Sequence, residues 1–509
     1  MKLSGKKRKR VRRIKPERAR LGEKVRLRAD VAPVKQPFSK AGLIVLHAFF
    51  VVLFLVSAFP VLPPWWNIAG IVLLVASFHY LFSLYLVRFH RERLERFNHC
   101  LAAVVLSIVM LGVARFTLWS SLSPAWIPLS GATLFFSLLL SQAVAFSASA
   151  CLLLAIGLMH YAAGQEDAVA AMVILGAGAA MAALTVSRVR RRSTLIRVGL
   201  FIGLAHLLVS LGIALFQEGA GAWDGETLSQ VFSYLVQGLL VGFLVSGLLP
   251  VIEYLFEVTT DVSLLELSNQ NENLVLRKLL IDSPGTFHHS FIVGILAEAA
   301  AERIGAHGLL CRVGAYFHDI GKMNKPQYFA ENADQDKSLH DDLSPEMSAL
   351  IITSHTKDSL ELADYYDLPS CLRAFMVEHH GTSRIEFFYN RALEKAREEG
   401  GQVDEEVFRY PGPKPQSKET AIVMLADAVE AAVRSLKKPT SARISALVRE
   451  LVMDRLQGEQ LDQCPLTLRD IRETEEEFTS VLIGIHHARP SYKTGDAETR
   501  RQARSRVTS

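Results

Sequence analysis

The chain has 509 residues, of which 50% are hydrophobic and 21% are charged, and its mean hydropathy is +0.22. A positive mean hydropathy at this length excludes a mainly disordered chain and indicates membrane-spanning segments. The formal net charge of +5 comes from the N-terminus, because residues 1–40 hold 16 Lys and Arg against three acidic residues and leave the remainder net negative.

The N-terminal arm, residues 1–40, is followed directly by a long apolar run. A basic arm can bind nucleic acid, but one beside an apolar run is more typical of a cytoplasmic anchor near anionic lipid. We therefore expect the lipid bilayer as a partner and no DNA or RNA polymer. The five cysteines are scattered and form no CxxC pair, so we expect neither a disulfide framework nor a zinc ribbon.

Residues 41–257 are a succession of apolar runs, and a spanning helix needs ~20 apolar residues. They predict a membrane domain of about eight helices, near 41–60, 67–88, 99–119, 127–145, 147–163, 167–187, 195–217 and 231–256. Arginine-rich loops follow the second and sixth spans, whereas residues 217–226 contain no Lys or Arg. Because basic loops stay in the cytoplasm, this count predicts a multi-pass protein of the inner (cytoplasmic) membrane, with its N-terminus and C-terminal half cytoplasmic.

The succession of long apolar runs ends before Val258. Residues 258–285 predict a juxtamembrane coupling helix, with Ser263–Ile281 as its amphipathic part, and residues 286–488 predict an all-helical domain. Ser344 followed by Pro345 is a typical helix start. Residues 489–509 are polar and basic without periodicity, and we expect them to be disordered. The predicted fold class is thus all-α: a polytopic helical membrane domain followed by a cytosolic all-helical domain.

Histidines and buried aspartates carry the chemistry of the C-terminal half. The helical stretch contains His288, His289, His318, Asp319, His355, His379, His380 and Asp427. Asp427 and Asp319 lie among apolar residues, and a buried carboxylate needs a partner. Imidazole and carboxylate groups together suit Fe, Mn or Zn. Any one of these residues is more readily interpreted as a helix cap or an ordinary core or surface residue, but the set favours a metal site.

His318-Asp319-Ile320-Gly321-Lys322 resembles the signature of HD-domain phosphohydrolases. Several further motifs resemble the multi-span membrane HD family, the PgpH-type cyclic-di-AMP phosphodiesterases. These motifs are Leu265–Ser268, Pro284–Ser290, Leu343–His355, His379–Ser383 and Tyr410–Glu419. The resemblance runs from about Leu265 to Leu436, and more loosely over the membrane half.

The resemblance implies two divalent transition-metal ions, Fe or Mn, held by seven side chains. One ion would be bound by His289, His318, Asp319 and Asp427, and the other by Asp319, His355, His379 and His380, with Asp319 bridging. The chain departs from the family in having no extracellular domain between the first two spans. The GYP motif of the cyclic-di-GMP branch is also absent, which makes cyclic-di-GMP the less expected substrate.

The expected reaction is hydrolysis of cyclic-di-AMP to the linear dinucleotide pApA by a hydroxide shared between two metals ~3.5–4 Å apart. Asp319 would fix the metal geometry. Lys322, three residues on, would neutralise charge on the phosphate. Weaker candidates for substrate contact, beside Lys322, are Lys325, Thr382, Arg409 and Lys414.

Three alternatives stay open at this point. The first is an HD phosphohydrolase acting on another nucleotide, linear or cyclic. The second is a nucleotide-binding membrane receptor without catalysis, although a degenerate HD domain usually loses metal ligands. The third is a transporter, which the lack of an intramembrane acid–base series argues against. Assembly into a homo-oligomer is a further open point.

Overall fold

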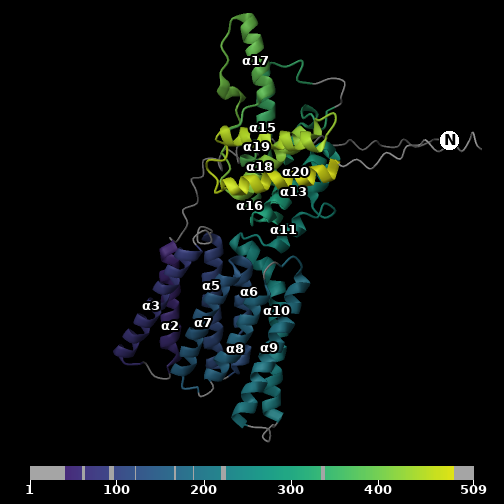
Figure 1. The fold of residues 1–509 in the computed structure, drawn as a ribbon. Helices are drawn as coiled ribbons and strands as arrows, with labels where there is room; N and C mark the ends of the chain where they lie inside the picture. The colour runs from purple at the N-terminus through teal and green to yellow at the C-terminus, as the bar shows by residue number, and fades with distance from the viewer. Residues whose placement is uncertain are drawn as a thin grey trace, which may run out of the picture. The chain divides into compact units, whose positions relative to one another are not determined.

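The computed structural model describes residues 40–59, 63–90, 97–120, 122–165, 168–186, 189–218, 225–333 and 339–486. Nearly all of the predicted N-terminal arm and the whole predicted tail, 489–509, lie outside these ranges. The described elements are all helical (Figure 1), and the single isolated bridge joins Arg384 and Arg409. The predicted all-α class is confirmed.

In the described part of the membrane half, eight apolar helices lie near the predicted spans. They are α2 (Lys40–Ala58), α3 (Trp65–Phe89), α5 (Phe97–Trp119), α6 (Leu129–Leu139), α7 (Gln142–Ala162), α8 (Ala168–Thr185), α9 (Arg192–Glu218) and α10 (Gly225–Phe256). Among the described residues, six of them are long and apolar enough to cross a bilayer, and α2 and α6 are shorter. The chain is therefore a multi-pass membrane protein.

The fourth predicted span, 127–145, does not form one full-length helix. Helix α6 has only 11 residues, or ~16 Å of length, against a hydrocarbon core of ~30 Å. Oγ1 of Thr133 in α6 lies 2.6 Å from Oγ of Ser149 in α7, and α6 packs against α10. Most of α6 is buried. It is a packed inner helix, and the prediction of a full span there was wrong.

The chain divides into two compact units, residues 1–127 with 151–172, and residues 128–150 with 173–509. In the first unit, α2 packs against α3 and α5; in the second, α9 packs along α10. Glycines allow this close approach, since a Cβ on Gly203 would lie 2.6 Å from the carbonyl oxygen of Leu235. Small residues at such contacts are typical of packed membrane helices.

The predicted coupling helix is two helices, α11 (Asp261–Leu267) and α12 (Leu274–Asp282). The polar run between them interrupts the helix. Oδ1 of Asn273 accepts hydrogen bonds from the backbone N–H groups of Val275, at 2.9 Å, and Leu276, at 3.2 Å. This side chain caps a new helix N-terminus, so a single amphipathic helix cannot continue through it.

The rest of the second unit is a helical bundle. It contains α13 (Pro284–Arg303), α14 (Gly308–Phe317), η2 (Ile320–Asn324), η3 (Pro326–Tyr328), α15 (Pro345–Tyr365), α16 (Ser370–Glu378), α17 (Glu386–Glu399), η4 (Glu405–Phe408), α18 (Lys418–Arg434), α19 (Ser441–Gln457) and α20 (Leu468–His486). Helix α18 is buried without interruption from Thr420 to Asp427 and contacts α13, α14, α16 and α19. It is the central helix of the bundle and places Asp427 in the interior.

Candidate metal centre

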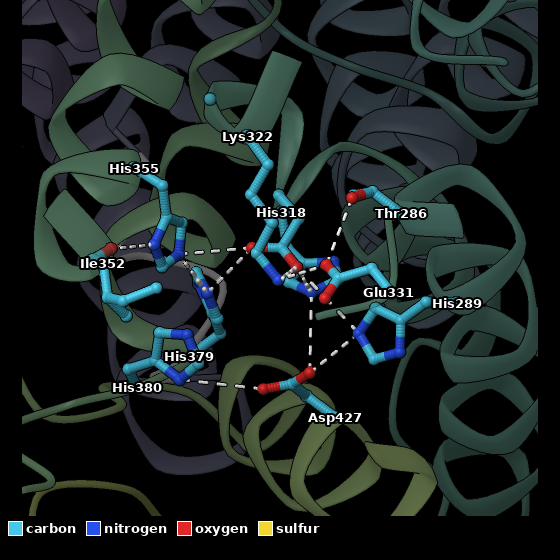
Figure 2. Close-up of polar contacts among 12 residues, drawn as sticks. Thr286, His289, His318, Lys322, Glu331, Ile352, His355, His379, His380 and Asp427 are labelled. Atoms are coloured by element: carbon cyan, nitrogen blue, oxygen red, sulfur yellow. Dashed lines mark hydrogen bonds and ion pairs between the residues drawn. The ribbon is translucent and has the colours of Figure 1, made fainter. Parts of the chain in front are cut away.

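Five helices bring imidazole and carboxylate groups to one point (Figure 2). His289 lies in α13, His355 in the middle of α15, and Asp427 in α18. His318 follows the last residue of α14, and His379 follows the last residue of α16. All five side chains are buried, although their positions span 139 residues of sequence.

The donor atoms form two groups that share Asp319. One group is His289, His318, Asp319 and Asp427, and the other is Asp319, His355, His379 and His380. Within each group the possible ligand atoms lie within 4.8 Å of one another. These are the two sets that the family resemblance implied, and the structure brings all seven side chains together.

Each oxygen of Asp319 faces one group. Oδ1 lies 3.2 Å from Nε2 of His355 and 3.5 Å from Nε2 of His379. Oδ2 lies 3.1 Å from Nε2 of His318. A carboxylate with one oxygen toward each group has the geometry of a bridging ligand.

Asp427 is the second carboxylate of the centre. Its Oδ1 is 2.9 Å from Nε2 of His289 and 3.8 Å from Nε2 of His318. Its Oδ2 is 3.6 Å from Nδ1 of His380. Asp427 therefore contacts donors of both groups.

Hydrogen bonds outside the centre fix the orientation of the rings. Nδ1 of His318 donates to the carbonyl of Ala315 at 2.6 Å, and Nδ1 of His355 donates to Ile352 at 2.6 Å. Nδ1 of His379 makes the same bond to Phe375. These bonds at Nδ1 turn the Nε2 atom of each ring toward the centre, which is the orientation that a metal ligand requires.

The two aspartates are ionised. Burial alone would raise the pKa of Asp319, but His318 and Lys322 lower it well below its usual range. Burial would also raise the pKa of Asp427, but hydrogen bonds from His289 and His318 lower it well below the usual range. Both groups are carboxylates, the form that binds metal.

Two imidazoles of the second group, those of His379 and His380, are neutral. Burial lowers the pKa of His379 to about 4. Burial, with the adjacent His379, lowers the pKa of His380 well below its usual range. A neutral imidazole keeps the lone pair with which it binds a metal.

Three buried atoms of the centre have unmet hydrogen-bonding capacity. Neither oxygen of Asp319, nor Nε2 of His318, has a well-aligned hydrogen-bond partner, although all three atoms are buried and Oδ2 pairs with Nζ of Lys322 at 2.7 Å. Buried polar atoms are normally satisfied. A divalent cation would satisfy all three, and a mixed imidazole and carboxylate set is one that transition-metal ions accept. The residues present therefore fit divalent metal binding.

A cavity opens onto the centre. Its wall includes His289, His355, His380 and Asp427 from the two groups, together with Lys322, Phe329, Glu331, Tyr410 and Arg434. Of the five residues predicted to contact substrate, only Lys322 is in this wall. Sequence reasoning missed Tyr410, Glu331 and Arg434.

Tyr410 packs flat against a member of the centre. Its ring stacks on that of His380, with centroids 4.1 Å apart and planes at 26°. It also meets the edge of His355, with centroids 6.0 Å apart. Tyr410 is the first residue of the motif Tyr410–Glu419, in which only Lys414 had been selected from the sequence as a candidate for substrate contact. The place of Tyr410 in that motif was the signal that could have identified it.

The other substrate candidates are held elsewhere. Lys325 is exposed. The backbone N–H of Thr382 donates to Oε1 of Gln460 at 2.9 Å. Arg409 pairs with Glu405 and donates to the carbonyl of Thr382 at 3.0 Å. Nζ of Lys414 lies 3.9 Å from a carboxylate oxygen of Glu459.

Two known families match the chain. One, described as a 7TM receptor with intracellular HD hydrolase, matches residues 65–260. The other, the HD domain, matches residues 286–432, which contain all seven donors. The chain is also 45% identical over 307 residues to the cyclic-di-AMP phosphodiesterase PgpH of Bacillus subtilis (strain 168), covering 59% of this chain and 42% of that protein.

The chain belongs to the PgpH-type membrane HD family. PgpH of Listeria monocytogenes serotype 1/2a (strain 10403S) is 40% identical over 308 residues, covering 59% of this chain and 41% of that protein. The crystal structure of the L. monocytogenes PgpH HD domain in complex with cyclic-di-AMP is 43% identical, with a TM-score of 0.40, and covers 43% of this chain and 99% of that one. This family member spans about two fifths of the length of the curated relatives it matches.

Proposed function

We propose that this chain is a membrane-bound, metal-dependent phosphodiesterase that hydrolyses cyclic-di-AMP to linear pApA. The observation that carries the proposal is the carboxylate of Asp319, which turns one oxygen to each of two histidine-rich donor groups. The choice of substrate is supported by the relatives, which are named cyclic-di-AMP phosphodiesterases. Acid–base groups in this arrangement suit the hydrolysis of a phosphodiester.

We assign one metal to His289, His318, Asp319 and Asp427, and the other to Asp319, His355, His379 and His380. Fe and Mn are the metals that the family resemblance implies, and both accept mixed nitrogen and oxygen donors. When bound, two such ions supply Lewis acidity toward a phosphate oxygen and make water acidic enough to act as a nucleophile near neutral pH.

The side chains of the cavity wall hold and orient the substrate. Lys322 and Arg434 contribute cationic groups to the wall, and a cyclic dinucleotide carries two phosphodiester groups. We assign Lys322 to the phosphate beside Asp319, and Arg434 to the second phosphate. In the reaction water adds to phosphorus, the bond to a ribose 3′-oxygen breaks, and that oxygen leaves as a hydroxyl after taking up a proton.

We place the HD domain and the N-terminus on the cytoplasmic side of the inner membrane. Arg192, at the start of α9, makes a bidentate contact with Glu266 of α11, at 2.8 and 3.1 Å. Arg190 lies 3.4 Å from Glu302 of α13. These contacts support a common side for the arginine-rich loop and the HD domain, and basic loops stay in the cytoplasm. A homo-oligomer stays an open expectation.

The full chain, purified in detergent and freed of metal, tests the function. Loaded with Mn²⁺ or Fe²⁺, it should hydrolyse cyclic-di-AMP in preference to cyclic-di-GMP and to linear nucleotides. Asp319→Ala should abolish hydrolysis, and Lys325→Ala, at an exposed position outside the cavity wall, should keep it. Equal rates for Asp319→Ala and the wild type would refute the metal centre as the catalyst. Binding of cyclic-di-AMP without hydrolysis would favour the receptor alternative.

A further inference from the structure

His289 differs from the other buried histidines of the centre in its outer hydrogen bond. His318, His355 and His379 each donate from Nδ1 to a backbone carbonyl three or four residues earlier. Nδ1 of His289 instead contacts the carboxylate of Glu430. The acceptor at His289 is thus a side-chain carboxyl group and not a backbone carbonyl, so the two metal sites have different surroundings.

Helix α18 holds His289 from both ends of the ring. Asp427 and Glu430 are three residues apart and share one face of α18. Oδ1 of Asp427 lies 2.9 Å from Nε2 of His289, and Glu430 meets Nδ1. The side chain of Glu430 is only 8% exposed. Its second oxygen, Oε1, lies 3.4 Å from Nη1 of Arg434, which reaches the wall of the cavity.

We propose that Glu430 is a positioning residue that makes the His289 site bind its ion more tightly than the His355–His379 site. The proposal rests on the metal centre assigned under the proposed function. A carboxylate on Nδ1 holds the imidazole in one tautomer, fixes the direction of its Nε2 lone pair and makes that nitrogen a stronger donor. No carboxylate contact of this kind is found at Nδ1 of His355 or His379, where the acceptors are Ile352 and Phe375.

Metal binding by the full chain tests this directly. The metal-free protein in detergent is titrated with Mn²⁺ by calorimetry, and bound Mn²⁺ is counted after desalting. The wild type should show a tight and a weaker binding event. His355→Ala should remove the weaker event and thereby assign it. Glu430→Ala should weaken the tight event by about 10- to 100-fold and leave the weaker event within about twofold of its wild-type affinity.

Conservative variants separate positioning from folding. Glu430→Gln retains an acceptor oxygen without the charge. The Mn²⁺ affinity of its tight event should therefore lie between that of the wild type and that of Glu430→Ala. Glu298→Gln, a partly buried carboxylate of α13 that pairs with Arg312 at 2.8 Å, should change neither event. If Glu430→Ala does not fold, Glu430→Gln alone decides the outcome.

Equal weakening of both events, or no change in either, would overturn the proposal. The titration contains no nucleotide, so its result is independent of catalysis. A wild type that binds two ions but hydrolyses no cyclic dinucleotide would refute the proposed function and leave this inference standing.

Discussion

Lys322 and Glu331 form a buried ion pair beside the metal centre, with Nζ of the lysine 2.9 Å from Oε1 of the glutamate. Nζ also lies 2.7 Å from Oδ2 of Asp319. Burial alone would lower the pKa of Lys322, but the two carboxylates raise it. The two carboxylates therefore favour the charged form of the lysine, and Glu331 holds its ammonium group in place.

Removing Glu331 should destabilise the HD domain, because it leaves a buried ammonium group with one carboxylate partner fewer. Glu331→Ala is expected to lose about 3 kcal/mol of stability, measured as a lower midpoint of thermal unfolding in detergent. Glu399→Ala is the matched control, since Lys395 and Glu399 form an exposed pair, with side chains 53% and 68% exposed, and such pairs contribute little. Equal midpoints for the two variants would contradict the prediction.

Removal of metal should lower both activity and stability. A ligand that binds only the folded state stabilises it by about 2.7 kcal/mol at a free concentration 100 times its Kd. A chelator should therefore stop hydrolysis and lower the unfolding midpoint, and added Mn²⁺ should restore both. In Asp319→Ala the midpoint should not respond to Mn²⁺. A response as large as that of the wild type would show that the stabilising ion binds elsewhere.

The stacking of Tyr410 on His380 should matter more than its hydroxyl. An aromatic pair contributes about 0.5–1.5 kcal/mol beyond the burial of area, which corresponds to roughly a 2- to 12-fold change. Tyr410→Leu is expected to lower kcat/KM for the cyclic dinucleotide by at least this factor, while Tyr410→Phe keeps the ring and most of the activity. If the Phe variant fell as far as the Leu variant, the hydroxyl would have to be the important group.

The proposed contact of Arg434 with the second phosphate can be tested by comparing substrates that have one or two phosphodiester groups. A hydrogen bond to a charged group contributes about 1.5–3 kcal/mol, so Arg434→Ala should raise KM for cyclic-di-AMP by roughly 10- to 100-fold. Bis(p-nitrophenyl) phosphate has a single phosphodiester, and its hydrolysis should change little. An equal loss on both substrates would place Arg434 in support of the metal centre instead.

Acid should weaken the contact between α18 and α20. Burial would raise the pKa of Asp470, but hydrogen bonds from Lys418, 2.8 Å away, and from Thr467 lower it. A carboxyl whose folded-state pKa is lowered stabilises the fold above its unfolded pKa of ~3.9 and loses that contribution as the pH falls through the folded value. Unfolding midpoints at pH 7 and pH 3 should therefore differ less for Asp470→Asn than for the wild type. The same pH dependence in both proteins would argue against the contact.

The sequence by itself determined the helical elements, because hydrophobic runs and helix caps are local properties. The apolar runs predicted α3, α5 and α8–α10 closely, and Ser344 caps α15 as expected, since its side chain accepts a hydrogen bond from the backbone N–H of Met347. The predictions gave too little weight to polar residues that interrupt a helix. Asn273 starts α12 inside the predicted coupling helix, and the break before Gln142 leaves α6 too short to span.

Only the tertiary structure decided which of these helices meet. Periodicity shows that Asp427 is on a buried face but not that His289, 138 residues earlier, is its partner. For the same reason nothing in the sequence pointed to Glu430 and Arg434. Their roles depend on the packing of α18 against α13, and locally they look like ordinary helix residues. Convergence depends on contacts between distant segments, and a local pattern of hydrophobicity carries no information on which segments those are.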